Sequence, residues 1–505
     1  MDAQSPPAEF DLAIIGGGIN GAGIARDAAG RGLKVLLVEQ NDLASGTSSA
    51  STKLVHGGLR YLEHAAFRLV HEALIERDVL LRIAPHIVRP MRFILPVGEG
   101  QRPSWMIRIG LALYDWLGRH KSLPRSRRLD LARDPEGASL RAGYRRGFDY
   151  WDCVVDDSRL VVLNALDAAL RGADIRTRTR CLRAERSDIW RLTLETDGRR
   201  GVVTARALVN ATGPWTARFA ELVLRLTTPE PVRLVKGSHI VVPRLYAHAS
   251  AYILQHPDRR VVFAIPYHDD FTLIGTTDEN FTGDPAAVTP SAAEIAYLCE
   301  AATRYFRAEV SAAQVVWAFA GVRSLYDDGS SQAQDVTRDY VLALDANPDT
   351  APLLNIYGGK ITTYRRLAEA ALAKLSHVFQ IDPPWTAGAP LPGGDLRGET
   401  IADFALRFAR EHGFLPSSLA NRLVAAYGTR ALDVVAAARG LDDLGPRFGT
   451  DLTAAEVRYL MRFEWAQTAN DVLWRRSKLG LGLAKTDAQR LAHFMAGATA
   501  GADHP

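Results

Sequence analysis

Apolar runs, a glycine-rich turn and a helical segment follow one another at the start of the chain. Residues 10–15 (FDLAII) and 34–39 (KVLLVE) are short and mostly apolar, which is typical of buried strands. Residues 20–29 between them can form a helix. This order of strand, turn, helix and strand predicts an α/β unit.

The middle of the chain has a different pattern. Short β-rich runs separated by turns occupy residues 238–243, 251–255, 261–267 and 271–278. Residues 268–270 (HDD) are a hairpin connection between the last two runs. We therefore expect a second sheet here.

Apolar residues recur at helical spacing in the last part of the chain. Ile401, Phe404 and Phe408 form one such series, and Leu419 begins the next. A link rich in proline and glycine, residues 383–394, comes before them. The pattern predicts an all-helical module, and nothing in it resembles a catalytic motif.

Composition excludes several classes of protein. The chain has 505 residues, 47% of them hydrophobic, which suggests roughly three globular domains. A net charge of +4 does not by itself indicate nucleic acid, and we expect none as a partner. Cys153, Cys181 and Cys299 form no CxxC pair, so we expect neither a metal site nor a disulfide framework. The N-terminus lacks the features of a signal peptide, and no apolar run reaches the roughly 18 residues of a transmembrane helix.

A dinucleotide-binding motif lies in the first turn. Gly16, Gly18 and Gly21 fit GxGxxG, with glycines for the tight turn, the approach of a pyrophosphate and the packing of the helix. Glu39 ends the second strand, where its carboxylate can accept hydrogen bonds from ribose hydroxyls. The context favours a dinucleotide over an ordinary glycine-rich turn, but the motif does not separate NAD from FAD.

The stretch KLVHGGLRYL, residues 53–62, combines glycines with groups that grip phosphate or move protons. It follows a run of hydroxyl side chains, Thr47 to Thr52, that could hold the ribityl chain and ring of an extended FAD. A solvated Ser/Thr loop is the alternative.

Several segments carry a family resemblance. They are ASGTSSASTKLVHGGLRYLEH (44–64), SWMIRIGLALYDWLG (104–118), VNATGPW (209–215), VKGSHIVVP (235–243), IGTTD (274–278), GVRSL (321–325), TRDY (337–340) and YGGKITTYRRLAE (357–369). In order and nearly end to end, they resemble the aerobic, FAD-linked glycerol-3-phosphate dehydrogenases. One departure is Ser324, where this family commonly has proline after the arginine.

The resemblance implies a fold. We expect an α/β FAD-binding Rossmann-like domain of the glycine/D-amino-acid oxidase, two-dinucleotide-binding type, an antiparallel β-sheet substrate domain and an all-α C-terminal domain. The FAD-binding domain would be discontinuous, over residues 10–90, 150–225 and 320–375. The substrate and membrane-facing domain would span 91–149 and 226–319, and the helical domain 390–505.

The resemblance also implies FAD as the cofactor and a set of contacts to it. The helix that begins near Thr362 can stabilise negative charge at the pyrimidine edge of the flavin. The expected cofactor-binding residues are Gly16, Gly18, Gly21, Glu39, Thr47, Ser48, Ser49, Thr52, Lys53, His56, Gly57, Gly58, Thr212, Gly213, Gly359, Lys360 and Thr362. Gly57 and Gly58 are expected to pack against the isoalloxazine ring.

The implied reaction is oxidation of sn-glycerol 3-phosphate to dihydroxyacetone phosphate, with a hydride passing to FAD. The arginine fork suits a phosphate dianion. By resemblance the substrate pocket is lined by Arg60, Tyr61, Thr276, Arg323, Arg338 and Lys360. His56 can accept the hydroxyl proton, His239 competes with it, and either can be structural.

The family passes electrons to membrane quinone. Residues 102–128 combine Trp105, Trp116 and seven Lys/Arg with the single acid Asp115, which suits an anionic lipid surface. The alternative is an amphipathic helix packed on the protein beside a solvated basic loop. By resemblance we expect a homodimer in the cytoplasm, attached peripherally to the inner face of the membrane.

Three other functions compete. An oxidase would pass the electrons to oxygen and share the site motifs, although the oxidases we compare usually carry an insertion. A flavin amino-acid oxidase of the same fold would need one arginine for a carboxylate. A non-catalytic nucleotide-binding protein would have no reason to keep Arg60, Arg323 and Lys360 in their motifs.

Overall fold

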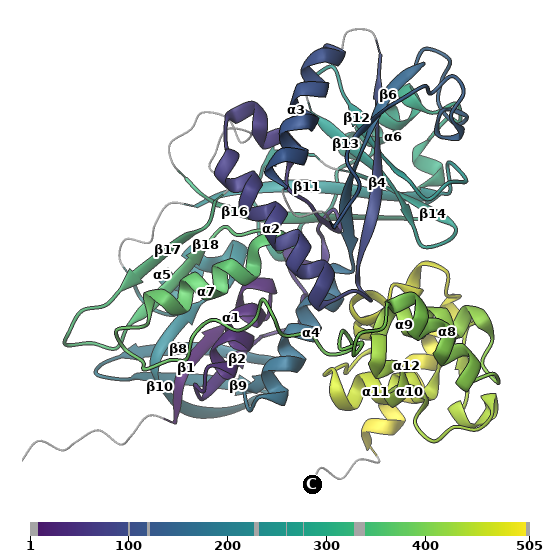
Figure 1. Ribbon diagram of the computed structural model, residues 1–505. Helices are drawn as coiled ribbons and strands as arrows, with labels where there is room; N and C mark the ends of the chain where they lie inside the picture. The colour runs from purple at the N-terminus through teal and green to yellow at the C-terminus, as the bar shows by residue number, and fades with distance from the viewer. Residues whose placement is uncertain are drawn as a thin grey trace, which may run out of the picture.

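The computed structural model describes residues 9–98, 102–118, 122–226, 232–258, 260–275, 277–327 and 339–500. Two large sheets, one below the other in Figure 1, meet through α2 (Phe67–Ile83) and the segments around it, and a helical body lies beside the lower sheet.

The lower sheet is built from three distant parts of the chain. Its order is β17-β18-β10-β1-β2-β7, with β9 and β8 added beside β10. The strands are β1 (Phe10–Ile15), β2 (Val35–Val38), β7 (Asp174–Arg176), β8 (Thr179–Arg186), β9 (Trp190–Thr196), β10 (Arg199–Asn210), β17 (Val341–Asp345) and β18 (Leu353–Tyr357). β1, β2, β10 and β18 run parallel, so their carboxyl ends lie at one edge.

Helices bury the face of this sheet. α1 (Ile19–Gly30) packs against α4 (Asp157–Leu170) and α7 (Tyr364–Lys374), while the short α5 (Thr216–Leu222) contacts β10 and β18. The predicted first α/β unit is confirmed within one residue at each boundary.

The upper sheet is mostly antiparallel. Its order is β15-β11-β14-β13-β12-β4-β6-β3, with β16 beside β11 and β5 beside β6. The strands are β3 (Leu54–Val55), β4 (Val88–Val97), β5 (Arg127–Leu129), β6 (Arg146–Val155), β11 (Val232–Pro243), β12 (Ala251–Gln255), β13 (Val261–Tyr267), β14 (Phe271–Gly275), β15 (Glu279–Asn280) and β16 (Trp317–Tyr326). The predicted hairpin at 268–270 is confirmed, because it joins β13 to β14.

Alternate residues of these strands face two different cores. Ile240 and Val242 pack toward α6 (Ala292–Tyr305), whereas Val241 between them packs toward α2 and α3 (Ser104–Leu117). The sheet is therefore covered on both sides.

Some strands within the predicted FAD-binding domain pair with the upper sheet. They are β3, the start of β4, residues 150–155 of β6 and residues 320–326 of β16. β16 pairs with β11 along its whole length, from Trp317 opposite Val241 to Tyr326 opposite Val232. These pairings are long-range, so local apolar patterns do not reveal them.

The C-terminal part is a helical body with its own core of Phe404, Phe408, Leu419, Leu423 and their neighbours. Its helices are α8 (Ile401–Glu411), α9 (Ser417–Tyr427), α10 (Ala431–Val435), α11 (Ala454–Phe463) and α12 (Lys485–Ala500). A two-stranded hairpin of β19 (Arg447–Phe448) and β20 (Leu452–Thr453) interrupts them, so the module is helical but not purely so. In the described ranges, no helix is long and apolar enough to cross a membrane.

Candidate active site

The glycine turn between β1 and α1 leaves no room for side chains. A Cβ at Gly16, whose φ is 113°, would lie 2.5 Å from the carbonyl oxygen of Ala211, and one at Gly21 would lie 1.9 Å from the carbonyl oxygen of Gly16. The segment Ala211–Thr212–Gly213 after β10 therefore lies directly against the turn. The amino end of α1 faces this open edge of the sheet, which suits an anionic ligand.

Glu39 lies beside the turn. Its carboxylate accepts hydrogen bonds from the backbone N–H of Gly17 at 2.7 Å and of Asn41 at 2.8 Å. Burial raises the pKa of Glu39 against these bonds. Each carboxylate oxygen keeps a second acceptor position, so the geometry fits a ribose hydroxyl as predicted. This cradle, which any Cβ would fill, fits an extended dinucleotide.

The run Thr47–Lys53, which we call the hydroxyl loop, joins the two sheets. Ser48 Oγ accepts from the N–H of Ile19 at 3.0 Å, and Thr47 Oγ1 donates to the carbonyl oxygen of Val322 on β16 at 2.5 Å. Thr52 Oγ1 lies 3.0 Å from Nε2 of His239 on β11. The loop is therefore fixed structure rather than the solvated Ser/Thr loop considered as an alternative.

Lys53 does not project toward this edge. Its ammonium lies 2.9 Å from both oxygens of Asp157 and donates to the carbonyl oxygen of Ser49 at 3.0 Å, and its side chain is buried. The predicted contact between Lys53 and FAD has no support in this geometry, because the ammonium is committed to Asp157, which follows 104 residues later in the chain.

The opposite wall comes from the segment after β18. Gly358 and Gly359 have φ of 73° and 95°, and Asn20 at the start of α1 donates to the carbonyl oxygen of Gly358 at 3.1 Å. Thr362 Oγ1 accepts from the backbone N–H of His56 at 3.3 Å. The predicted residues His56, Gly359 and Thr362 thus come together at the carboxyl ends of the parallel strands.

Packing inside the protein, apart from the predicted contact with the ring, requires glycine at position 57. A Cβ there would lie 2.5 Å from Leu74 and 2.6 Å from the hydroxyl oxygen of Tyr114. Its N–H donates to that hydroxyl at 2.9 Å, and the hydroxyl in turn donates to Asp152 at 2.7 Å. Sequence reasoning missed Tyr114 and Asp152, although Ile107, Leu111 and Tyr114 follow one another at helical spacing.

Two of the predicted basic residues come from segments that lie near Gly358, since Lys360 follows it closely and the carbonyl oxygen of Ser324, the residue after Arg323, would lie 3.6 Å from a Cβ there. The ammonium of Lys360 lies 4.0 Å from the ring centroid of Tyr61, a cation–π contact. Arg323 on β16 pairs with Asp278 and donates to the carbonyl oxygen of Thr277 at 3.4 Å. Its side chain is 36% exposed. Arg60 is half-buried beside Tyr61, whereas the predicted residues Thr276 and Arg338 lie outside the described residues.

The two candidate histidines differ in environment. His239 is buried and stacked on Phe319, with ring centroids 4.9 Å apart. Burial, together with Lys53 and Arg323, lowers the pKa of His239 to about 3. His56 is half-buried, and its ring centroid lies 6.5 Å from that of Phe263.

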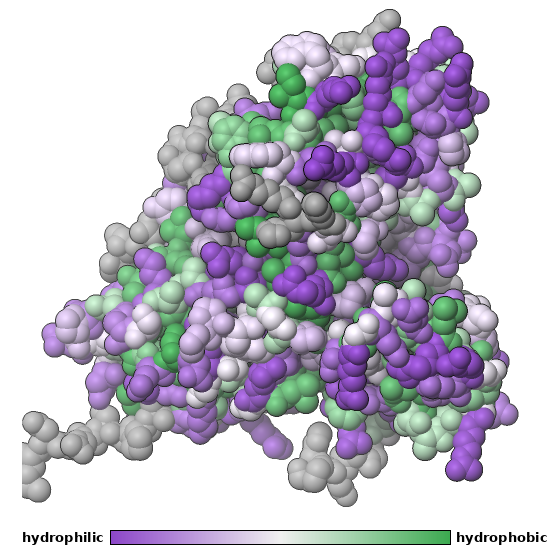
Figure 2. All heavy atoms as spheres, in the orientation of Figure 1, coloured by the Kyte–Doolittle hydropathy of each residue, from purple (hydrophilic) through white to green (hydrophobic). Residues whose placement is uncertain are grey.

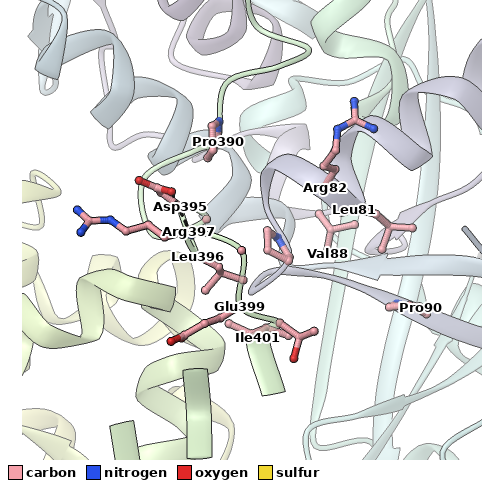
Figure 3. Close-up of a pocket in the computed structure, with 14 residues that line it drawn as sticks. Leu81, Arg82, Val88, Pro90, Pro390, Asp395, Leu396, Arg397, Glu399 and Ile401 are labelled. Carbon is pink, nitrogen blue, oxygen red and sulfur yellow. Dashed lines mark hydrogen bonds between the residues drawn. The ribbon is translucent and has the colours of Figure 1, made fainter. Parts of the chain in front are cut away.

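An open groove of about 550 Å³ lies elsewhere, between the end of α2 and the start of the helical body (Figure 3). Leu81 and Val88 line one side of it, and Leu396 and Ile401 the other. None of the predicted site residues lines this groove, so it is separate from the edge described above.

Comparison with known protein families gives two matches. Residues 11–365 match the family model described as FAD dependent oxidoreductase, and residues 384–500 match the C-terminal domain of alpha-glycerophosphate oxidase. Together the two models cover most of the chain.

Three curated relatives match along nearly their whole length. The chain is 53% identical to a glycerol-3-phosphate dehydrogenase of Pseudomonas aeruginosa, over 97% of this chain and 96% of the relative. It is 51% identical to a D-erythritol 1-phosphate dehydrogenase of Brucella abortus, over 97% and 98%. It is 48% identical to the aerobic glycerol-3-phosphate dehydrogenase of Escherichia coli, over 96% and 97%.

Solved structures agree on the fold. The glycerol-3-phosphate dehydrogenase of Bacillus halodurans complexed with FAD superposes with a TM-score of 0.74 at 25% identity, over 97% of this chain and 94% of that one. The glycine oxidase of Geobacillus kaustophilus superposes with a TM-score of 0.53 at 21% identity, over 76% and 98%.

Proposed function

Because the chain belongs to the FAD-dependent glycerol-3-phosphate dehydrogenase family, we propose that it oxidises sn-glycerol 3-phosphate to dihydroxyacetone phosphate. The proposal rests on two observations: the ammonium of Lys360 lies over the ring of Tyr61, and the partly exposed Arg323 precedes Ser324, whose carbonyl oxygen lies beside Gly358. A dianion and a dinucleotide would lie side by side there.

Arg323 is the principal phosphate-binding residue in this proposal. One of its terminal nitrogens is bonded to Asp278 and Thr277, and its other N–H groups have no partner among the described residues. A guanidinium with spare donors in a partly exposed position can bind two phosphate oxygens. Lys360 adds a second positive charge without a carboxylate partner in the described ion pairs.

When bound, FAD supplies the acceptor for the hydride that leaves C2 of the substrate. The hydroxyl proton needs a base, and we assign that role to His56. A histidine whose pKa is about 3, as for His239, is a poor proton acceptor near neutral pH. Thr362 fixes the backbone of His56, so its ring is held at the carboxyl ends of the strands.

A related substrate is the second candidate. The relative from Brucella abortus, whose identity is close to that of the Pseudomonas enzyme, is named for D-erythritol 1-phosphate. Both substrates carry a phosphate and a neighbouring secondary alcohol, so the cation cluster alone does not separate them.

Anaerobic mixing tests the substrate. We expect glycerol 3-phosphate to bleach the visible absorbance of the bound flavin faster than D-erythritol 1-phosphate does. Faster bleaching by D-erythritol 1-phosphate would make that compound the substrate. No bleaching by either compound would refute the phosphate site. In the same assay His56→Gln should slow bleaching by about 10²-fold or more, and an unchanged rate would remove His56 as the base.

The same sample identifies the electron acceptor. We propose a membrane quinone, so addition of quinone should restore the absorbance quickly and oxygen slowly. Fast return with oxygen would favour the oxidase.

The outer face of α3 supports contact with an anionic lipid surface. Ile107, Leu111 and Tyr114 on the inner side of this helix pack on the protein, while the other side is apolar and exposed, which supports the lipid proposal. Trp105, Ile109 and Trp116 are 64%, 60% and 58% exposed, and apolar and pale spheres gather over this helix in the upper part of Figure 2. Aromatic and apolar residues on one face of a helix suit the interface of a bilayer.

Vesicle binding tests this surface. Trp105→Ser with Trp116→Ser should weaken binding to vesicles that contain phosphatidylglycerol, whereas Leu406→Ser, an exposed apolar change on α8, should not. Equal loss in both variants would contradict a specific surface. Attachment to the inner face of the cytoplasmic membrane and a homodimer complete the proposal, and light scattering tests the dimer.

A further inference from the structure

The segment 471–481 (DVLWRRSKLGL) belongs to the helical body, yet it lies against the back of the hydroxyl loop. It begins with a π-helical turn, Asp471–Arg476, a distortion that is frequent at functional sites. Trp474 packs on Trp317 of β16, with ring centroids 4.8 Å apart. The helical body thus reaches the strand that holds Arg323.

Lys478 is the buried cation of this segment. Its side chain is almost inaccessible, and its ammonium donates to Ser158 Oγ at 3.2 Å and to the carbonyl oxygen of Trp474. It also lies 5.9 Å from the ring centroid of Trp317. A buried ammonium is retained only where carboxylates and hydrogen-bond acceptors compensate for its lost hydration.

Asp157 provides that compensation and connects Lys478 to the loop. Ser158 Oγ donates to Asp157 at 3.3 Å. The same carboxylate accepts from Lys53 at 2.9 Å and from Ser51 Oγ at 2.7 Å. Lys53 then donates to the carbonyl oxygen of Ser49. A continuous chain of hydrogen bonds runs from the helical body to the loop.

Both lysines have unfavourable backbone conformations. The φ of Lys53 is 60° and that of Lys478 is 140°, values that L residues rarely adopt. Such conformations cost of order 1–3 kcal/mol each and persist only where the surroundings enforce them. Two strained lysines on either side of one buried aspartate indicate that this arrangement is maintained for something other than folding alone.

We propose that Lys478 is a positioning residue for the FAD site, acting through Ser158, Asp157 and Lys53 to hold the hydroxyl loop against the glycine turn. The loop's contacts to the N–H of Ile19 and to His239 depend on that hold. The helical body supplies no group to the predicted reaction site, yet it controls how tightly FAD binds. This inference rests on the FAD site of the proposed function, but not on the choice of substrate.

The experiment compares FAD binding in three variants of the full chain. Lys478→Met removes the charge and keeps the length of the side chain, and Ser158→Ala breaks only the connection to Asp157. Arg422→Gln is the control, because it removes an ion pair with Glu456 inside the helical body, away from the loop. The dissociation constant of FAD is measured by flavin fluorescence, together with the visible spectrum of bound flavin and the melting temperature.

We expect Lys478→Met to weaken FAD binding by about 10-fold, which is about 1.4 kcal/mol, and to shift the visible spectrum. Ser158→Ala should weaken binding by about 3-fold. Arg422→Gln should lower the melting temperature and leave both flavin readouts unchanged.

Wild-type FAD affinity and spectrum in Lys478→Met, or equal weakening in Arg422→Gln, would overturn the proposal. If Lys478→Met does not fold, Ser158→Ala decides: a dissociation constant equal to that of the wild type would refute the connection. Substrate specificity does not enter these readouts, so failure here is distinct from failure of the proposed reaction.

Discussion

Basic side chains lie on both sides of the hydroxyl loop, but the two sides differ in how completely carboxylates neutralise their charge. At the back, Arg159 is 1% exposed and pairs with the fully buried Glu464 through two hydrogen bonds. At the front, Arg323 is 36% exposed and uses one terminal nitrogen for Asp278. At the back the positive charge is paired and buried, whereas at the front the guanidinium of Arg323 keeps N–H donors that no described residue occupies.

This difference separates a structural cation from a binding cation. A buried charge must be paired, and removing one partner leaves the other uncompensated. A partly exposed charge keeps some hydration and can exchange it for a ligand's oxygens. Residue type does not distinguish the two cases; burial and the number of occupied donors do.

The largest effect on stability is expected at the back. Arg159→Met leaves the carboxylate of Glu464 buried without its main partner, which should lower the free energy of unfolding by about 3–5 kcal/mol. Urea denaturation measures this. The double variant Arg159→Met with Glu464→Leu should recover part of the loss. A loss below about 1 kcal/mol, the range of exposed pairs, would remove the distinction between the two sides.

The matching change at the front should affect catalysis instead. Arg323→Met removes the donors assigned to the phosphate, which should lower kcat/KM by an amount equivalent to about 2–5 kcal/mol. The free energy of unfolding should fall less than in Arg159→Met, since Arg323 is itself 36% exposed although its partner Asp278 is only 7% exposed. Steady-state kinetics with glycerol 3-phosphate and urea denaturation on the same sample check both halves. Normal kinetics with reduced stability would make Arg323 another structural cation.

The pH dependence of stability sharpens the comparison, because the back also contains a buried neutral group. Among the residues that the structure describes, neither ring nitrogen of His86 has a hydrogen-bond partner, and burial, with Arg159 nearby, lowers the pKa of His86 to about 3. The unfolded chain therefore binds a proton below pH 6.5 that the folded chain does not. Stability falls as the pH drops from 6.5 toward 3, and at pH 5 the loss from this group is about 2 kcal/mol.

His86→Leu should remove the part of the pH-dependent loss of stability that comes from this histidine. Its unfolding free energy should fall less steeply between pH 6.5 and pH 5 than that of the wild type, while His493→Leu, at an exposed position on α12, should leave the slope unchanged. Parallel slopes in the wild type and His86→Leu would show that His86 does not titrate as its surroundings imply.

The front and the back also differ in how far the sequence predicted them. The first α/β unit follows from local patterns and was confirmed, and Glu39 lies beside the glycine turn, bonded to the N–H of Gly17. Lys53 was assigned to the cofactor by resemblance, but its ammonium is bonded to Asp157, which lies far along the chain. The pairing of β16 with β11 is likewise decided by tertiary contacts, which no local period encodes.

Gly57 shows the same limit and leads to the smallest predicted effect. Two glycines beside His56 suggest close approach of a ligand, yet the first of them is required by Leu74 and Tyr114.

The hydroxyl of Tyr114 accepts from Gly57 N–H and donates to Asp152, so Tyr114→Phe leaves a buried donor with only a long bond of 3.4 Å to Asp152. We expect a loss of about 1–3 kcal/mol in the free energy of unfolding. kcat should fall as well, because Gly57 precedes Arg60 and follows His56 directly. Tyr150→Phe is the matched control, since Tyr150 lies in the same core with its ring 5.8 Å from that of Tyr114. If both variants lose equal stability and neither loses activity, the hydroxyl of Tyr114 only fills space, and the front wall of the site is held by packing alone.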